Sequence, residues 1–333
     1  MAESTTASTS SRGLVAVMAG AGLLGFAAVF VKWGLLGGAS PVTIGWYRML
    51  IALPLVGWLA RRGNGLVFGR GAAWGLLAGG AFTGDLTLWH YSMRFTSAAN
   101  ATFIICGLTP IWVALFSIVV YRRRYRWSGW LGQILGLSGA LLLALARGAR
   151  VGNGYGEAVA FAASFCYAAF GLLISRSRRH VSARQSLFWM SVGSLTCFTF
   201  LEAIERQPLA GFSPLAWAGF FGLGIVIQFL AWLSINSGLG RVDVALGALA
   251  LGLQQVATPF LAAWLVNEPL RPLGLVGGAI IIVGIYLVAS GEGARSPPKA
   301  RSAPTGRTGR SLRVPGRPSR YVSTGARHQR DQS

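Results

Sequence analysis

The chain has 333 residues, of which 53% are hydrophobic and only 12% carry a charged side chain. Soluble proteins average about 25% charged residues, so this composition excludes an ordinary soluble domain and indicates a membrane protein. The net charge of +21 does not predict a nucleic-acid partner, because ten of the thirty basic residues lie after Gly291 and most others lie in short breaks between apolar runs. That distribution is typical of residues that set membrane topology.

Ten apolar segments follow one another along the chain. An α-helix needs about 20 residues to cross the hydrocarbon core of a bilayer, and each segment is close to that length. The segments are predicted at 14–33, 41–60, 71–92, 97–120, 127–146, 156–175, 185–204, 213–236, 243–266 and 272–290. The connections between them are too short to hold a separate soluble domain. The sequence therefore predicts an all-α membrane protein with ten transmembrane helices.

The two ends of the chain differ from the apolar segments in composition. Residues 1–13 are rich in Ser and Thr, and residues 291–333 are rich in Arg, Ser, Pro and Gly. Segments with so few aliphatic residues cannot bury enough apolar surface to fold, so both ends are predicted to be disordered. The C-terminal one forms a basic tail.

The basic residues between the segments predict the orientation. If the N-terminus is cytoplasmic, the inner side receives 13 Lys and Arg residues and the outer side receives six, before the tail is counted. The arginines of 122–126 contribute four of the 13. Since cytoplasmic loops carry the excess of Lys and Arg, both termini are expected inside the cell, at the inner membrane.

A displacement of 145 residues aligns the chain with itself. Arg126 then matches Arg271 and Gly139 matches Gly284, at equivalent places in the predicted helices. The two repeats, at 14–147 and 154–290, hold five helices each, so the second must be inverted in the membrane. Inverted repeats are typical of secondary transporters, which bind their solute at the repeat interface. A channel is the alternative.

Short motifs mark the first repeat, and the second repeat ends with a related pattern. Thr96-Ser97-Ala98-Ala99-Asn100 leads into a helix with Leu108-Thr109-Pro110, and Asn267-Glu268-Pro269-Leu270 precedes the last helix. With these motifs the chain resembles the EamA-type transporters of the drug/metabolite transporter superfamily. The resemblance implies ten helices, a central cavity, and export or uptake of small metabolites. One departure is that Tyr121–Arg124 replaces the acidic turn usual in the family, which survives here only at Glu268.

Arg48 and Asp85 are ionisable residues inside predicted membrane helices. Such groups are costly in a bilayer and are functional candidates. At 1.5 Å per residue, both lie about 10 Å from the outer end of consecutive antiparallel helices. We therefore expect them to form an ion pair that faces the cavity. The alternative is a purely structural pair that holds the two helices together.

Other polar and aromatic residues inside the helices complete the predicted substrate-binding set. Together with Arg48 and Asp85, the set contains Trp89, Asn100, Gln228 and Gln255. Each amide is also explained by an interhelical hydrogen bond. Glu202 and Glu205, near the end of one helix, are expected to be outer-surface groups.

The sequence contains no GxxxxGK[ST] motif for ATP, no HExxH motif for zinc and no plausible Ser–His–Asp set. No enzyme, cofactor or metal is therefore expected. The predicted function is secondary transport of a small polar metabolite (an amino acid, a related compound or a drug) by alternating access, with export slightly favoured. The expected partners are this solute, membrane lipid and a coupling proton. The alternative is a non-transporting anchor or scaffold whose basic tail binds anionic lipid or nucleic acid.

Overall fold

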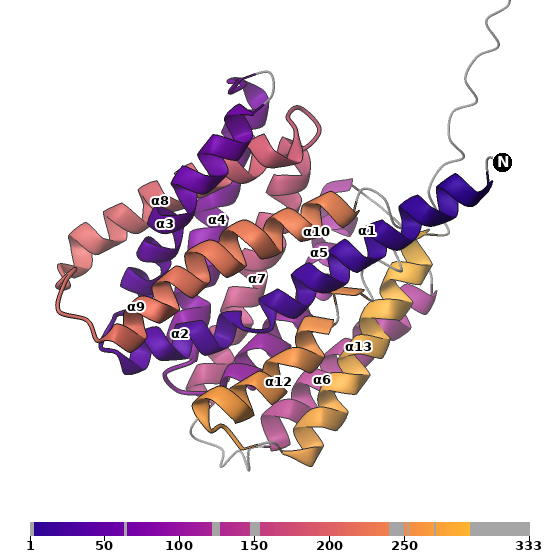
Figure 1. Cartoon of the computed structure of the whole chain (residues 1–333). Coiled ribbons are helices and arrows are strands. Elements are labelled where there is room, and N and C mark those ends of the chain that lie inside the picture. Colours follow the sequence, from indigo (N-terminus) through magenta and orange to yellow (C-terminus); the bar gives the residue numbers. More distant parts are fainter. Residues whose placement is uncertain are drawn as a thin grey trace, which may run out of the picture. The chain divides into compact units, whose positions relative to one another are not determined.

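The computed structural model describes residues 3–62, 65–121, 127–146, 154–239, 250–251, 253–269 and 271–293 (Figure 1). Within these ranges every regular element is a helix. The first half contains α1 (Glu3–Leu24), α2 (Ala27–Leu36), α3 (Pro41–Arg61), α4 (Arg70–Ser92), α5 (Ala98–Tyr121) and α6 (Trp127–Ala146). The second half contains α7 (Tyr155–Ser177), α8 (Ala183–Glu205), α9 (Pro214–Phe221), η1 (Gly222–Ala231), α10 (Trp232–Leu239), α12 (Leu253–Val266) and α13 (Pro272–Gly293).

The helix boundaries follow from local sequence. Ser40 precedes α3, and its hydroxyl accepts a hydrogen bond from the backbone N–H of Thr43 at 3.1 Å. Ser213 caps α9 in the same way, and a proline takes the first position of both helices. Serine side chains satisfy the free N–H groups of a first turn, and proline there loses no hydrogen bond.

The first helix begins before the predicted apolar segment. α1 begins at Glu3, so residues 3–13 continue the apolar helix toward the N-terminus. Once a helix is nucleated, each added residue gains one backbone hydrogen bond, which explains why a polar segment can extend it. Most of the basic tail, from residue 294 onward, lies outside the described residues.

Five helical stretches are long and apolar enough to cross a membrane. They are Ser11–Leu36, Pro41–Arg61, Tyr155–Ser177, Ala183–Glu205 and Pro214–Ile235, and shorter apolar helices accompany them. The protein is therefore a multi-pass, all-α membrane protein.

Helices of the two halves pack against one another in matching pairs. α4 packs on α7 and α8, and α10 and η1 pack on α1 and α3 respectively. α5 packs on α7, and α12 packs on α1 and α2. The pairs α6–α13 and α3–α8 each join one helix of one half to one of the other, and Figure 1 shows α6 alongside α13. For these pairs, exchanging the first half for the second gives another pair of the same set.

Glycine permits the closest of these approaches. A Cβ atom added to Gly79 of α4 would collide with Met190 O and Ser194 N of α8, and one added to Gly193 would collide with Leu76 O. Small residues of this kind let the backbones of membrane helices approach closely.

The alanine substitution of Gly79 is accordingly expected to destabilise the protein by about 1–3 kcal/mol, the usual cost of overpacking. The measurement is thermal unfolding of the detergent-purified protein. Gly171→Ala on α7 is the matched control, because a Cβ there has nothing within 4 Å. Equal unfolding temperatures for the two variants would contradict the close packing of α4 on α8.

Candidate functional site

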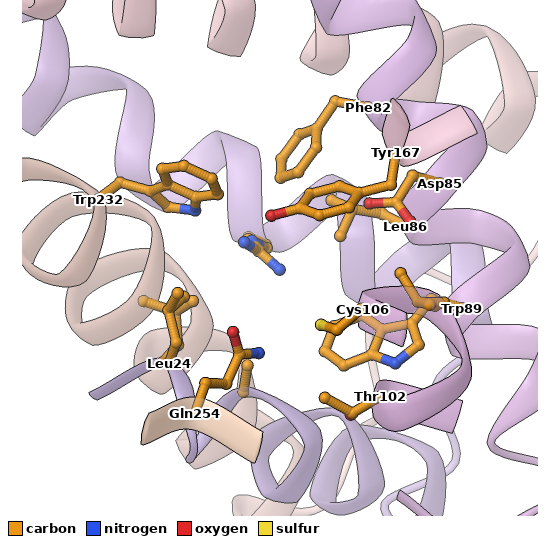
Figure 2. A pocket seen from close by; sticks show the side chains of 14 residues that line it. Leu24, Phe82, Asp85, Leu86, Trp89, Thr102, Cys106, Tyr167, Trp232 and Gln254 are labelled. Carbon is orange, nitrogen blue, oxygen red and sulfur yellow. The ribbon is translucent and has the colours of Figure 1, made fainter. Parts of the chain in front are cut away.

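A cavity of about 60 Å³ lies among the helices of both halves (Figure 2). Its lining comes from α1, α2, α3, α4 and α5 in the first half and from α7, η1, α10 and α12 in the second. In Figure 2 Leu24, Gln254 and Trp232 lie on one side of it, and Asp85, Cys106 and Trp89 on the other.

Arg48 of α3 is buried, with 2% of its surface exposed, and it lines this cavity. Its Nε donates a hydrogen bond to Oε1 of Gln228 at 3.0 Å, and its guanidinium carbon lies 5.4 Å from the centre of the Phe82 ring. Its Nη1 has no hydrogen-bond partner among the described residues. Gln228 therefore holds the Nε side of the guanidinium in place, and the Nη1 group remains available for a further hydrogen bond.

Asp85 of α4 lines the same cavity and is 5% exposed. Its Oδ1 has no hydrogen-bond partner among the described residues. The expected ion pair with Arg48 is not formed: within the described ranges a salt bridge of 4.0 Å or less joins Lys32 to Glu268, and none joins Arg48 to Asp85. The physical reason is that Gln228 of η1 binds the guanidinium from the other half of the chain.

Of the other four predicted site residues, only Trp89 is among the residues that line this cavity. Trp89 lines the cavity, and Gln228 binds Arg48. Asn100 is buried on α5, two residues before the lining residue Thr102, and its Nδ2 has no described partner. The side chain of Gln255 lies outside the described residues, whereas its neighbour Gln254 lines the cavity.

Aromatic residues beyond the predicted set also line the cavity. Tyr167 of α7, Phe82 of α4 and Trp232 of α10 surround it, and the rings of Phe82 and Trp232 pack edge to face at 6.3 Å. Tyr167 was missed, although a tyrosine in the middle of an apolar helix is the signal that marks such a position. We call Tyr167, Phe82 and Trp232 the aromatic wall of the cavity. The same cavity is also lined by two charged side chains.

A second cavity, of about 230 Å³, adjoins the first. Both are lined by Tyr167 and Trp232. The second also reaches Thr109 on α5 and Arg178, which follows the last residue of α7. The pair of cavities therefore leads from the middle of the helices toward the end where α7 ends and α8 begins.

At the opposite end, a network of polar contacts surrounds Lys32 of α2. Its Nζ donates hydrogen bonds to Met93 O at 2.8 Å and Thr96 O at 3.3 Å, and it forms an ion pair with Glu268 Oε1 at 3.2 Å. The two Glu268 oxygens lie 3.1 and 3.0 Å from the backbone N–H of Ala98, at the start of α5. A carboxylate is favourable there because helix N-termini carry partial positive charge. We refer to Lys32, Glu268 and Ala98 as the Lys32 latch.

The Lys32 latch connects the two halves of the chain. Lys32 and Ala98 belong to the first half, and Glu268 follows α12 in the second. In the same corner, the hydroxyl of Thr96 donates to Glu157 of α7 at 2.6 Å. Both contacts hold the connection between α4 and α5 against the second half.

Comparison with known proteins gives the family. The model of the EamA-like transporter family matches twice, at residues 11–145 and 154–290. An uncharacterized transporter of Archaeoglobus fulgidus is 23% identical over 270 residues, which cover 79% of this chain and 92% of that protein. The uncharacterized transporter YwfM of Bacillus subtilis is 24% identical over 266 residues, covering 76% and 85%.

A solved crystal structure shares the fold. It has a TM-score of 0.61 at 21% sequence identity, and the match covers 87% of this chain and 99% of the other. The two family matches together span most of the chain, one in each half. This protein belongs to the EamA-like transporter family.

Proposed function

We propose that this protein is a secondary transporter that carries a small zwitterionic metabolite, such as an amino acid, through the membrane by alternating access. The observation that carries the proposal is the cavity between the halves, which holds Arg48 and Asp85 without pairing them. The family and its transporter relatives favour transport over catalysis. We keep the orientation with both termini cytoplasmic, at the inner membrane, and export as the favoured direction.

The charges of the cavity favour a solute with two charges. A buried charge is costly unless it is paired and hydrogen-bonded. Arg48 Nη1 offers a donor and Asp85 Oδ1 an acceptor, and neither has a partner among the described residues. A carboxylate bound to Arg48 and an ammonium bound to Asp85 would satisfy both groups at once. Gln228 positions Arg48, and the aromatic wall contacts the apolar part of the solute.

The remaining residues of the predicted site are assigned by position. Trp89 contacts the solute from α4. Asn100 and Gln255 stay in the proposed site on the sequence argument alone, because Asn100 does not line this cavity and the side chain of Gln255 lies outside the described residues. Asp85 is the acidic group that we propose to carry a coupling proton, since it is buried and lines the cavity.

Alternating access is supported by the difference between the two ends. The Lys32 latch closes one end, while the second cavity extends toward Arg178 at the other. In the proposed orientation the arginine-rich end is cytoplasmic, so this is an inward-facing state. The matching helix pairs and the two family matches support ten helices in two inverted repeats, at 14–147 and 154–290.

The proposal is tested by competition among related compounds in everted membrane vesicles. For an amino acid that the vesicles transport, the free amino acid should compete at least about tenfold better than its carboxamide or its deaminated acid. Each analogue lacks one charged hydrogen bond, which contributes about 1.5–3 kcal/mol. Equal competition by the three compounds would contradict a site that binds both charges.

A further inference from the structure

A surface groove of about 630 Å³ runs along α3 toward its C-terminal end and shares no lining residue with the two cavities. Phe188 of α8 lines it from the second half of the chain, and α3 and α8 pack side by side (Figure 1). The lining residues of α3 recur every three or four positions, which places them on one face of the helix. They are Leu50, Leu53, Pro54, Gly57, Trp58 and Arg61.

The apolar part of this groove lies on a membrane-spanning helix. Pro41–Arg61 is one of the stretches that are long and apolar enough to cross a bilayer. Leu50 is 38% exposed and Trp58 is 52% exposed, and the Phe188 ring lies so close to Gly57 that an added Cβ would be 3.3 Å from it. Lipid tails are as apolar as leucine side chains, so exposed apolar groups on such a helix are in contact with acyl chains.

The end of the groove is basic. Arg61 is the last residue of α3, Arg62 follows it, and both are exposed and line the groove. The guanidinium carbon of Arg62 lies 3.7 Å from the centre of the Trp58 ring. Stacking of this kind uses the flat face of the guanidinium, so its N–H groups, which lie in the plane, can still bind phosphate oxygens. Arg184 of α8 donates from Nη1 to Arg62 O at 3.4 Å, which brings a third arginine to the same end.

The chain supplies no counter-charge near these arginines. Residues 62–69, after α3, and residues 178–182, before α8, contain no Asp or Glu. Within the described ranges the salt bridge of 4.0 Å or less joins Lys32 to Glu268, and none involves the three arginines of the groove. The basic end of the groove is therefore complementary to an anion from outside the chain.

We propose that this groove binds an anionic phospholipid, with its phosphate group on Arg61 and Arg62 and an acyl chain along the apolar face of α3. Arginine binds phosphate through paired N–H groups, and basic pockets beside membrane helices hold anionic head groups. Trp58, one turn before the arginines, lies where aromatic rings meet the head groups. A free phosphate ion would leave the apolar part of the groove unfilled. The site is independent of the transported solute and of the direction of transport.

The test uses the full-length protein purified in detergent. It is titrated with dioleoylphosphatidylglycerol or with dioleoylphosphatidylcholine, and bound lipid is counted by native mass spectrometry. The acyl chains are the same, but the choline cation compensates the phosphate charge and is repelled by the arginines. Phosphatidylglycerol is therefore expected to bind about tenfold more tightly, and equal affinity for the two lipids would overturn the proposal without any variant.

The double variant Arg61→Gln, Arg62→Gln is expected to bind phosphatidylglycerol about thirtyfold more weakly, which corresponds to about 1 kcal/mol for each arginine. The matched control is Arg178→Gln, Arg179→Gln, which removes the same charge from two exposed arginines that do not line the groove. This control should retain the affinity of the unmodified protein.

Three further results would overturn the proposal. Unchanged affinity in Arg61→Gln, Arg62→Gln would show that the groove does not hold the head group. An equal loss in the control variant would show a general attraction between the basic surface and the lipid. Displacement of the lipid by an equal concentration of glycerol 3-phosphate, which has the phosphate but no acyl chain, would assign a site for free phosphate compounds.

Discussion

Arg48→Leu is expected to reduce transport by roughly tenfold to a hundredfold. Arg48 is buried in the cavity, and its Nη1 is the free cationic donor proposed to bind the carboxylate of the solute. A hydrogen bond between charged groups contributes about 1.5–3 kcal/mol, which corresponds to that loss in affinity. The measurement is initial uptake into everted vesicles, normalised to the amount of folded protein.

Loss of fold is separated from loss of function by two further variants. Arg48→Leu leaves the charge of Asp85 uncompensated in the same cavity, so the single variant loses stability as well. The double variant Arg48→Leu, Asp85→Leu removes both charges and should recover expression without recovering transport. Arg94→Leu, the matched control, changes an exposed arginine that lies over the Tyr91 ring and should transport normally. Full transport by the double variant would make the two residues purely structural.

Weakening the Lys32 latch is expected to open the cavity on its closed side. Glu268→Ala removes both the ion pair with Lys32 and the acceptor for Ala98 N–H, whereas Glu268→Gln keeps an acceptor and loses only the charge. The expected order of opening is therefore Glu268→Ala, then Glu268→Gln, then the unmodified protein. A loss of about 1–2 kcal/mol raises the population of a minor open state roughly five- to thirtyfold.

The native Cys106 provides the readout, because it lines the cavity. In a background with Cys166→Ser and Cys197→Ser, a membrane-impermeant thiol reagent is added to right-side-out or everted vesicles. The unmodified protein should be labelled mainly from the arginine-rich side, and Glu268→Ala should gain labelling from the other side. Arg94→Leu is again the control. Unchanged sidedness in Glu268→Ala would show that the Lys32 latch does not close the cavity.

The helical, membrane-spanning character of the chain could be predicted because composition and segment length determine it directly. Arg48 and Asp85, which the sequence sets at equal depth on consecutive helices, both line one cavity. The prediction of an ion pair between them was wrong, because the side chain that binds the Arg48 guanidinium is Gln228, 180 residues away in the sequence. Depth along a helix follows from residue number, but the angle at which helices of the other half approach does not.

Glu202 and Glu268 show the same limit at the helix ends. Glu202 stands at the end of an apolar segment, where a sequence reading expects an exposed group, yet the beginning of α3 covers it. Glu268 was recognised as part of a motif, but its contacts with Lys32 and Ala98 join segments that are distant in sequence. Both roles depend on which helix ends meet, and only the packed structure shows that.

The most direct test of a transporter with its site between the halves is solute counterflow in proteoliposomes. Purified protein is reconstituted with a high internal concentration of an unlabelled amino acid, and a trace of the labelled compound is supplied outside. The account predicts transient, saturable accumulation that persists when the chain is truncated after Gly293 and is lost in Arg48→Leu. Failure of every amino acid in a complete panel to accumulate above protein-free liposomes would contradict it, as would accumulation that requires the basic tail but not Arg48.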